Sequence, residues 1–103
     1  MATATAEFFE ELAQRGYEPT LQSVTGTVRF DIIGAGNWWV TVKEGALTVA
    51  SGGSSADCVY TTTAEDFVSM VRGALNPFTA ALQGKVQLTG NTALALVMQR
   101  IFR

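Results

Sequence analysis

The residues of this chain that could take part in catalysis are few and scattered. Histidine is absent from the 103 residues, which removes the commonest general base and the commonest metal ligand. Catalysis would have to use a carboxylate, the single cysteine Cys58, or a lysine such as Lys43 or Lys85. One cysteine and dispersed acids also fail to match any recognised spacing of metal ligands. The sequence therefore predicts a protein that is not an enzyme and that needs no metal or other cofactor.

Each candidate group also has a purely structural explanation. Arg29 and Asp31 lie two residues apart in an alternating segment, so we expect them to pair on the outer face of a strand. Cys58 lies in another strand pattern without a base nearby in sequence, so we expect a small buried side chain. The glycines of Gly34-x-Gly36 precede a strand pattern and not a helix, which excludes a phosphate-binding loop at that place.

The composition is apolar and weakly charged. Hydrophobic residues make up 48% of the chain and charged residues 16%. Because so little polar surface is available, we expect some apolar area to be exposed or to line a pocket. The net charge of −2 comes from seven basic and nine acidic residues without a run of either sign, which argues against a nucleic-acid partner.

The length and the ends of the chain suggest a single small domain. With 103 residues we expect one core and one domain over residues 1–103. The first residues lack the basic start and apolar stretch of a secretory signal, and no apolar run is long enough to span a membrane. A single cysteine fits a reducing compartment. We therefore expect a soluble, cytoplasmic protein.

Alternation with a period of two predicts five strands. Residues 24–32, 38–43, 47–49, 57–62 and 86–89 each place apolar side chains on one side. We expect the first four strands to form an antiparallel meander, because the connections between them are short. Trp38 and Trp39 are neighbours in one strand, so one should enter the core and the other should be partly exposed.

Four helices are predicted by helical periodicity and by capping residues. A helix over residues 6–15 should bury Phe8, Phe9 and Leu12. Thr63, Asn76 and Asn91 are suited to cap the next three helices. In the helix begun at Asn76, we expect Phe78, Ala81 and Leu82 to face inward. In the last helix, over residues 91–103, a broad apolar stripe leaves Gln99 and two arginines outside it. Its members are Leu94, Val97, Met98, Ile101 and Phe102.

Together these patterns predict an α+β fold with an antiparallel-dominated sheet of about five strands and helices packed on one face. The last helix must lie on apolar material. The question is whether it covers a solid core or a cavity that holds a ligand.

A long series of short motifs now resembles the sterol carrier protein 2 domain family. Upstream, the two hairpin strands look like those of the family, in Val28-x-Phe30-Asp31-Ile32 and Trp38-x-Val40-x-Val42-Lys43-x-Gly45. The later series follows the family in order and spacing: Ala56-Asp57-Cys58, Thr61-Thr62, Asp66-Phe67, Met70, Gly73, Asn76-Pro77, Ala81, Gln83-Gly84-Lys85, Thr89-Gly90-Asn91 and Leu94-Ala95. The likeness covers most of the chain. The peroxisomal tail and the C-terminal extension of the animal proteins are missing, so we expect a stand-alone bacterial member.

The resemblance implies a hydrophobic tunnel between sheet and helices that binds fatty acids, fatty acyl-CoA, sterol-like or isoprenoid lipids without altering them. We expect the late helices to supply the lining, with methionines that adapt to ligands of different shape. The predicted ligand-binding residues are Phe67, Met70, Val71, Leu75, Phe78, Leu82, Leu88, Leu94, Val97, Met98, Ile101 and Phe102.

The alternative is a protein-interaction or self-associating accessory module whose cavity has collapsed, for example in lipid or quinone metabolism. The partners that we expect are thus a hydrophobic small molecule, a membrane in transient contact, or a second copy in a homodimer. Lipid uptake and self-association would distinguish the two readings.

Overall fold

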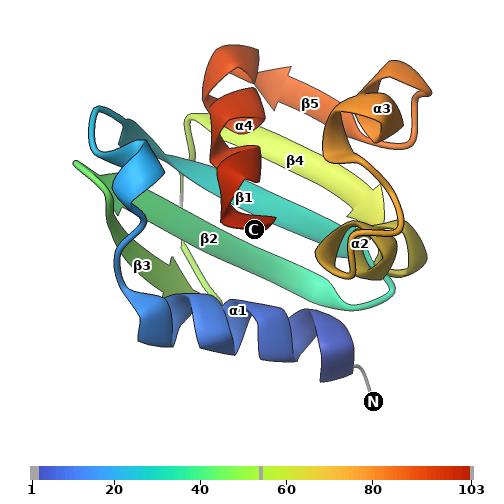
Figure 1. The fold of residues 1–103 in the computed structure, drawn as a ribbon, viewed down its shortest axis with the longest axis horizontal. Helices are drawn as coiled ribbons and strands as arrows, with labels where there is room; N and C mark the ends of the chain where they lie inside the picture. The colour runs from blue at the N-terminus through green and yellow to red at the C-terminus, as the bar shows by residue number, and fades with distance from the viewer. Residues whose placement is uncertain (1–2, 54, 103) are drawn as a thin grey trace.

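The computed structural model describes residues 3–53 and 55–102 and shows an α+β fold with the helices on one face of a five-stranded sheet (Figure 1). The elements follow in the order α1 (Thr3–Arg15), η1 (Pro19–Leu21), β1 (Thr25–Ile33), β2 (Gly36–Lys43), β3 (Ala46–Ala50), β4 (Cys58–Thr63), α2 (Ala64–Val71), α3 (Pro77–Leu82), β5 (Gln87–Gly90), α4 (Thr92–Met98) and η2 (Gln99–Phe102), where η denotes a 3-10 helix. The predicted fold class is confirmed.

The strand order corrects one prediction. The sheet runs β3-β2-β1-β4-β5, and β4 pairs with β1 in parallel, while the other three pairs are antiparallel. The meander therefore ends at β3, and the chain between Ala50 and Cys58 crosses back to the far side of β1. A parallel neighbour needs a crossover longer than a tight hairpin turn, and the Gly-Ser-rich segment after Ala50 supplies it.

The inner face of the sheet and the helices share one aromatic core. Alternate residues of β1 are buried, among them Phe30. The ring of Phe9, from α1, stacks on Trp38 of β2 with centroids 4.6 Å apart and on Phe67 of α2 with centroids 5.3 Å apart. Offset stacking of this kind adds about 0.5–1.5 kcal/mol per pair to the burial of the rings. These contacts join α1, the sheet and α2.

The outer face of the sheet carries the predicted ion pair. Arg29 Nε donates to Asp31 Oδ1 at 2.8 Å, which confirms the expected pairing. Trp39 lies on this face with the Arg29 guanidinium 5.9 Å from its ring centroid and is partly buried, as Trp38 is on the inner face.

The three predicted helix caps are present. Each cap side chain accepts a hydrogen bond from a backbone N–H of the first turn, as an N-cap residue does. The bonds run from Asp66 N to Thr63 Oγ1 at 3.1 Å, from Phe78 N to Asn76 Oδ1 at 2.8 Å and from Leu94 N to Asn91 Oδ1 at 3.1 Å.

The inward orientation predicted for two residues of α3 is wrong. Phe78 and Leu82 are 54% and 88% exposed, and the residue that α3 buries is Ala80. Phe78 and Leu82 are four positions apart and therefore share one helix face. A helix of six residues anchored through a small alanine presents that face to solvent.

The last helix also differs from the prediction. It is divided into α4 and the 3-10 turn η2, whereas a continuous helix was expected. A 3-10 turn contains three residues per turn instead of 3.6, so the side chains change direction at the junction. Gln99 is consequently buried, with 4% of its surface exposed, although helical periodicity placed it outside the apolar stripe. Within the described residues, no helix has the length and apolar character required to cross a bilayer.

The turn from β5 into α4 leaves no space for a side chain at Gly90, which has a φ of +89°. A Cβ atom there would lie 2.6 Å from the carbonyl oxygen of Asp57. We predict that Gly90→Ala lowers the free energy of unfolding by about 1–3 kcal/mol or more, because it adds a clash to a left-handed backbone conformation. Urea denaturation measures this. Gly52→Ala is the control, since its Cβ would meet nothing within 4 Å. Equal losses for both variants would contradict the assignment.

Candidate functional site

A pocket of about 480 Å³ opens where the end of α2, the start of α3 and η2 meet. Its volume lies in the range of about 300–1,000 Å³ that is usual for small-molecule sites. The lining is mainly apolar and is formed by Met70, Gly73, Leu75, Asn76, Pro77, Phe78, Gln99, Arg100 and Phe102.

The backbone between α2 and α3 creates this space. Gly73, with φ +81°, ends α2 and donates its N–H to the Met70 carbonyl at 3.1 Å. Asn76 then caps α3, and Pro77 occupies its first turn, where a missing N–H is tolerated. The chain thus leaves one helix and starts the next within a few residues. The helix stop at Gly73 and the helix start at Asn76-Pro77 therefore produce this wall of the pocket.

One lining residue, Gln99, takes part in a buried hydrogen bond. The Tyr60 hydroxyl, from the centre of β4, donates to Gln99 Oε1 at 2.8 Å and lies 3.7 Å from the sulfur of Met70. Burial raises the pKa of Tyr60 far above its usual value, so the hydroxyl stays protonated and able to donate. Gln99 Nε2 is buried and has no hydrogen-bond partner among the described residues. An unsatisfied buried donor is costly, so this amide favours a ligand that brings an acceptor.

Two arginines hold η2 in place next to the pocket. Arg100 donates to the Thr20 carbonyl at 2.7 Å, and Arg15 donates to the Ile101 carbonyl at 3.4 Å. The Arg100 side chain is exposed and also lines the pocket. Among the described residues that form the lining, Arg100 is the one that carries a charge, and this charge is positive.

The twelve predicted ligand-binding residues are divided among three environments. Met70, Leu75, Phe78 and Phe102 line the pocket. Phe67, Leu94, Met98 and Ile101 are fully or almost fully buried in the core, and Val71, Leu88 and Val97 pack against it. Leu82 is exposed to solvent and is not among the lining residues. Contact of any of them with a ligand stays a prediction.

Five lining residues were not predicted as ligand-binding residues: Gly73, Asn76, Pro77, Gln99 and Arg100. The motif Asn76-Pro77 and the glycine gave a signal, because they mark the break between two helices. For Gln99 the sequence contains no signal of a place in the pocket, since helical periodicity puts it on the polar side of the last helix.

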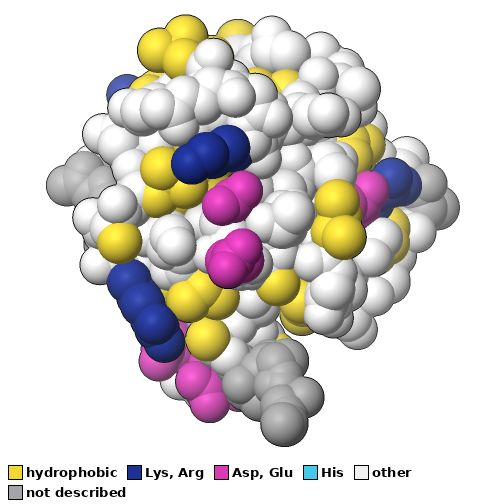
Figure 2. Space-filling view, turned by 90° about the vertical axis from the view of Figure 1, so that its right-hand side faces the viewer, with side chains coloured by type: hydrophobic (Ala, Val, Ile, Leu, Met, Phe, Trp, Pro, Cys, Tyr) yellow, Lys and Arg dark blue, Asp and Glu magenta, His cyan; other side chains and the backbone are white. Residues whose placement is uncertain are grey.

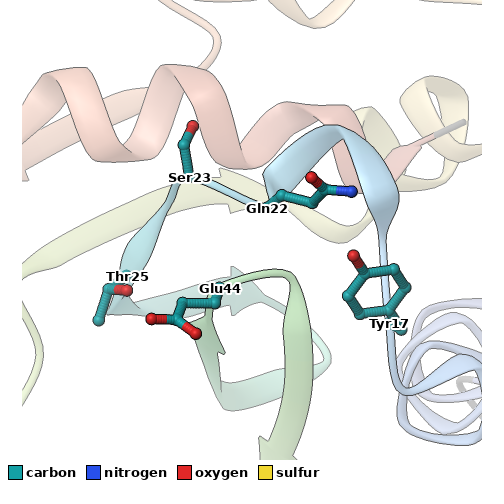
Figure 3. A pocket seen from close by; sticks show the side chains of 5 residues that line it. All are labelled: Tyr17, Gln22, Ser23, Thr25 and Glu44. Atoms are coloured by element: carbon teal, nitrogen blue, oxygen red, sulfur yellow. The ribbon is translucent and has the colours of Figure 1, made fainter.

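A second pocket, of about 570 Å³, lies near η1 and the turn between β2 and β3 (Figure 3). Its lining is polar and consists of Tyr17, Gln22, Ser23, Thr25 and Glu44. The carboxylate of Glu44 and the hydroxyls and amide around it are well hydrated in such an open groove. An apolar ligand would gain little there, so we regard the smaller pocket as the candidate site.

The potential catalytic groups are not brought together. Cys58 is buried in β4, and burial raises the pKa of its thiol. Among residues 3–53 and 55–102, no three acidic or cysteine side chains converge as metal ligands would.

Comparison with known proteins gives one consistent result. The model of the SCP-2 sterol transfer family matches residues 7–103. Hydroxysteroid dehydrogenase-like protein 2 from Xenopus tropicalis is 31% identical over 99 residues, covering 92% of this chain and 24% of the relative. Sterol carrier protein 2 from Homo sapiens is 38% identical over 65 residues, covering 62% of this chain and 12% of the relative. The chain thus spans a quarter or less of the length of these relatives.

A solved structure agrees with the sequence matches. The solution structure of palmitated SCP2L2 from Aedes aegypti superposes with a TM-score of 0.80 and 26% identity, covering 100% of this chain and 96% of the other. The resemblance inferred from the motifs is therefore confirmed, together with the fold.

The burial of Cys58 leads to a prediction about its reactivity. Because the thiol is 1% exposed and its pKa is raised, we expect reaction with Ellman's reagent at pH 8 to be at least about 100-fold slower in the folded protein than in urea. The control is Ser51→Cys in a Cys58→Ala background, which places a thiol at an exposed position and should react rapidly when folded. Rapid labelling of folded Cys58 would reopen the question of a nucleophile.

Proposed function

The chain belongs to the SCP-2 sterol transfer family, and we propose that it is a non-catalytic domain that binds one long-chain lipid in the pocket between α2, α3 and η2. The observation that carries the proposal is the combination of an apolar lining with one unpaired buried amide, that of Gln99. The best-supported ligand class is a fatty acid. A palmitated relative of 26% identity supports that choice.

The energetics of a fatty acid suit such a site. Burying a chain of about 16 carbons at about 0.8 kcal/mol per methylene yields on the order of 10 kcal/mol before losses. Loss of translational and conformational freedom removes several kcal/mol. Micromolar affinity is then reachable with few polar contacts. Because one methylene contributes so little, we expect loose selectivity for chain length.

The polar end of the ligand would meet Gln99 and Arg100. Gln99 Nε2 can donate to a carboxylate, while Oε1 keeps its bond from the Tyr60 hydroxyl. The exposed Arg100 guanidinium in the lining supplies a positive charge, opposite in sign to that of the carboxylate. The hydrocarbon would lie against Met70 and Phe102, where the flexible thioether adapts to its shape.

A longer tunnel would require rearrangement of the core. Phe67, Met98 and Ile101 fill the space between the helices and the sheet. We propose that a long ligand displaces these side chains as it extends from the pocket, which would bring the predicted core residues into contact with it. In a multidomain setting like that of its longer relatives, the domain would hold a lipid for transfer or for use by other enzymes.

The pocket can be tested with a charge at a partly exposed lining position. We predict that Leu75→Glu weakens binding of a fluorescent fatty acid about tenfold or more, because a carboxylate in an apolar pocket must be desolvated and repels the ligand. Leu96→Glu, at an exposed position of α4 outside the pocket, is the matched control and should bind normally. Absence of saturable binding by the wild-type protein, with no lipid found by native mass spectrometry, would refute the proposed function.

The role of the amide can be tested separately. We predict that Gln99→Met weakens fatty-acid binding by about tenfold to hundredfold, since a hydrogen bond to a charged group is worth about 1.5–3 kcal/mol. Binding of diphenylhexatriene, a hydrocarbon without a polar group, should change less than threefold. Equal losses for both probes would show that the substitution damages the pocket and that Gln99 does not contact the polar end.

A further inference from the structure

The signs of charge are separated along the chain although no run of like charge exists. All nine acidic residues lie in residues 1–66, together with three basic ones, which gives that part a net charge of −6. Residues 67–103 contain four basic residues and no acidic one, a net charge of +4. The later part forms α3, β5, α4, η2 and most of α2. The pocket therefore opens in the positive half of the chain.

The most exposed large apolar side chain in the described structure lies beside this pocket. Leu82 is 88% exposed, and Phe78, one helical turn earlier on α3, is 54% exposed and lines the pocket. Helix α3 carries no charge of its own. Figure 2 shows the side of the molecule that includes α2 and α3, where hydrophobic side chains gather along the upper part; below them a Lys or Arg side chain lies next to Asp or Glu side chains.

Three exposed basic residues surround α3. Arg72 caps the end of α2 next to Gly73, Lys85 follows α3 and donates its N–H to the Ala80 carbonyl at 2.9 Å, and Arg100 lines the pocket. Two acidic side chains lie in this region, at the start of α2: Glu65 is exposed, and Asp66 lines a further pocket together with Lys85. The pocket next to α3, near Arg72 and Arg100, has no acidic residue in its lining among the described residues.

We propose that α3 is a docking element for anionic lipid bilayers, with Leu82 and Phe78 entering the interface and Arg72, Lys85 and Arg100 contacting acidic head groups. Exposed apolar side chains together with flanking basic residues are what binding to an anionic membrane requires. A second copy is disfavoured, because two positively charged faces repel each other. Helix α1 is unsuited, because its apolar residues are buried and its exposed side carries Glu7, Glu10 and Glu11.

Docking in this orientation would place the mouth of the pocket against the bilayer. Phe78 belongs to both the docking face and the pocket lining, and Ala80 is the one residue that α3 buries. A lipid could then pass between bilayer and pocket with little exposure to water. This consequence rests on the proposed function, whereas docking itself does not.

Vesicle co-sedimentation tests the proposal. We predict that the full chain binds vesicles of 30% phosphatidylglycerol in phosphatidylcholine at 50 mM salt, and that binding falls at least fivefold in pure phosphatidylcholine or at 500 mM salt. Leu82→Gln should weaken binding about fivefold or more, and the double variant Arg72→Glu/Lys85→Glu should weaken it more strongly. The matched controls are Tyr17→Gln, an exposed aromatic elsewhere, and Lys43→Glu, an exposed lysine on the sheet.

The outcomes separate docking from ligand binding. All four variants lie outside the pocket lining, and circular dichroism and urea denaturation should give wild-type curves that confirm that each is folded. Equal vesicle binding by Leu82→Gln and Tyr17→Gln, or by the double variant and Lys43→Glu, would overturn the proposal. So would concentration-dependent self-association that Leu82→Gln abolishes without vesicle binding by the wild type. Docking without fatty-acid uptake would refute only the proposed function.

Discussion

The hydrogen bond from the Tyr60 hydroxyl to Gln99 Oε1 is the interaction on which the site depends. It connects the centre of β4 to the 3-10 turn at the end of the chain, across the core. Because the bond uses only the oxygen of the amide, the nitrogen is left without a partner among the described residues. A methionine or leucine at position 99 would leave a core without an unsatisfied polar group. We propose that this free amide nitrogen recognises an acceptor on the ligand.

Around the pocket, α2 and η2 are fixed by packing and by hydrogen bonds, whereas α3 is more exposed. The aromatic core around Phe9 and Phe67 fixes α1 and α2 against the sheet. Arg15 of α1 donates to the Ile101 carbonyl of η2, and Arg100 of η2 donates to the Thr20 carbonyl of η1; both arginines are exposed. Helix α3, anchored by Ala80, is the least buried wall, so displacement of this helix would perturb the core least. The distribution of burial thus suggests where the site can change shape.

The architecture was predictable from the sequence where one local signal dominated. Alternation fixed the inner faces of the strands, and Thr63, Asn76 and Asn91 marked three helix starts that the structure confirms. The pairing of β4 with β1 was missed, because alternation gives the faces of a strand and not its neighbour. The burial of Gln99 was missed because the change from α to 3-10 geometry is a tertiary effect. In α3, a short helix with two large apolar side chains resembled a core helix, and only its packing through Ala80 reveals that they face solvent.

Side-chain amide NMR on ¹⁵N-labelled protein is the most direct test of the central claim. During titration with palmitate, the Gln99 side-chain NH₂ signals, assigned with a Gln99 variant, should shift in a saturable manner together with the backbone amides of Met70, Leu75 and Phe102. Signals around Tyr17 and Glu44, at the second pocket, should stay in place. Saturable binding of palmitate without any shift at Gln99, or with shifts confined to the second pocket, would contradict the account.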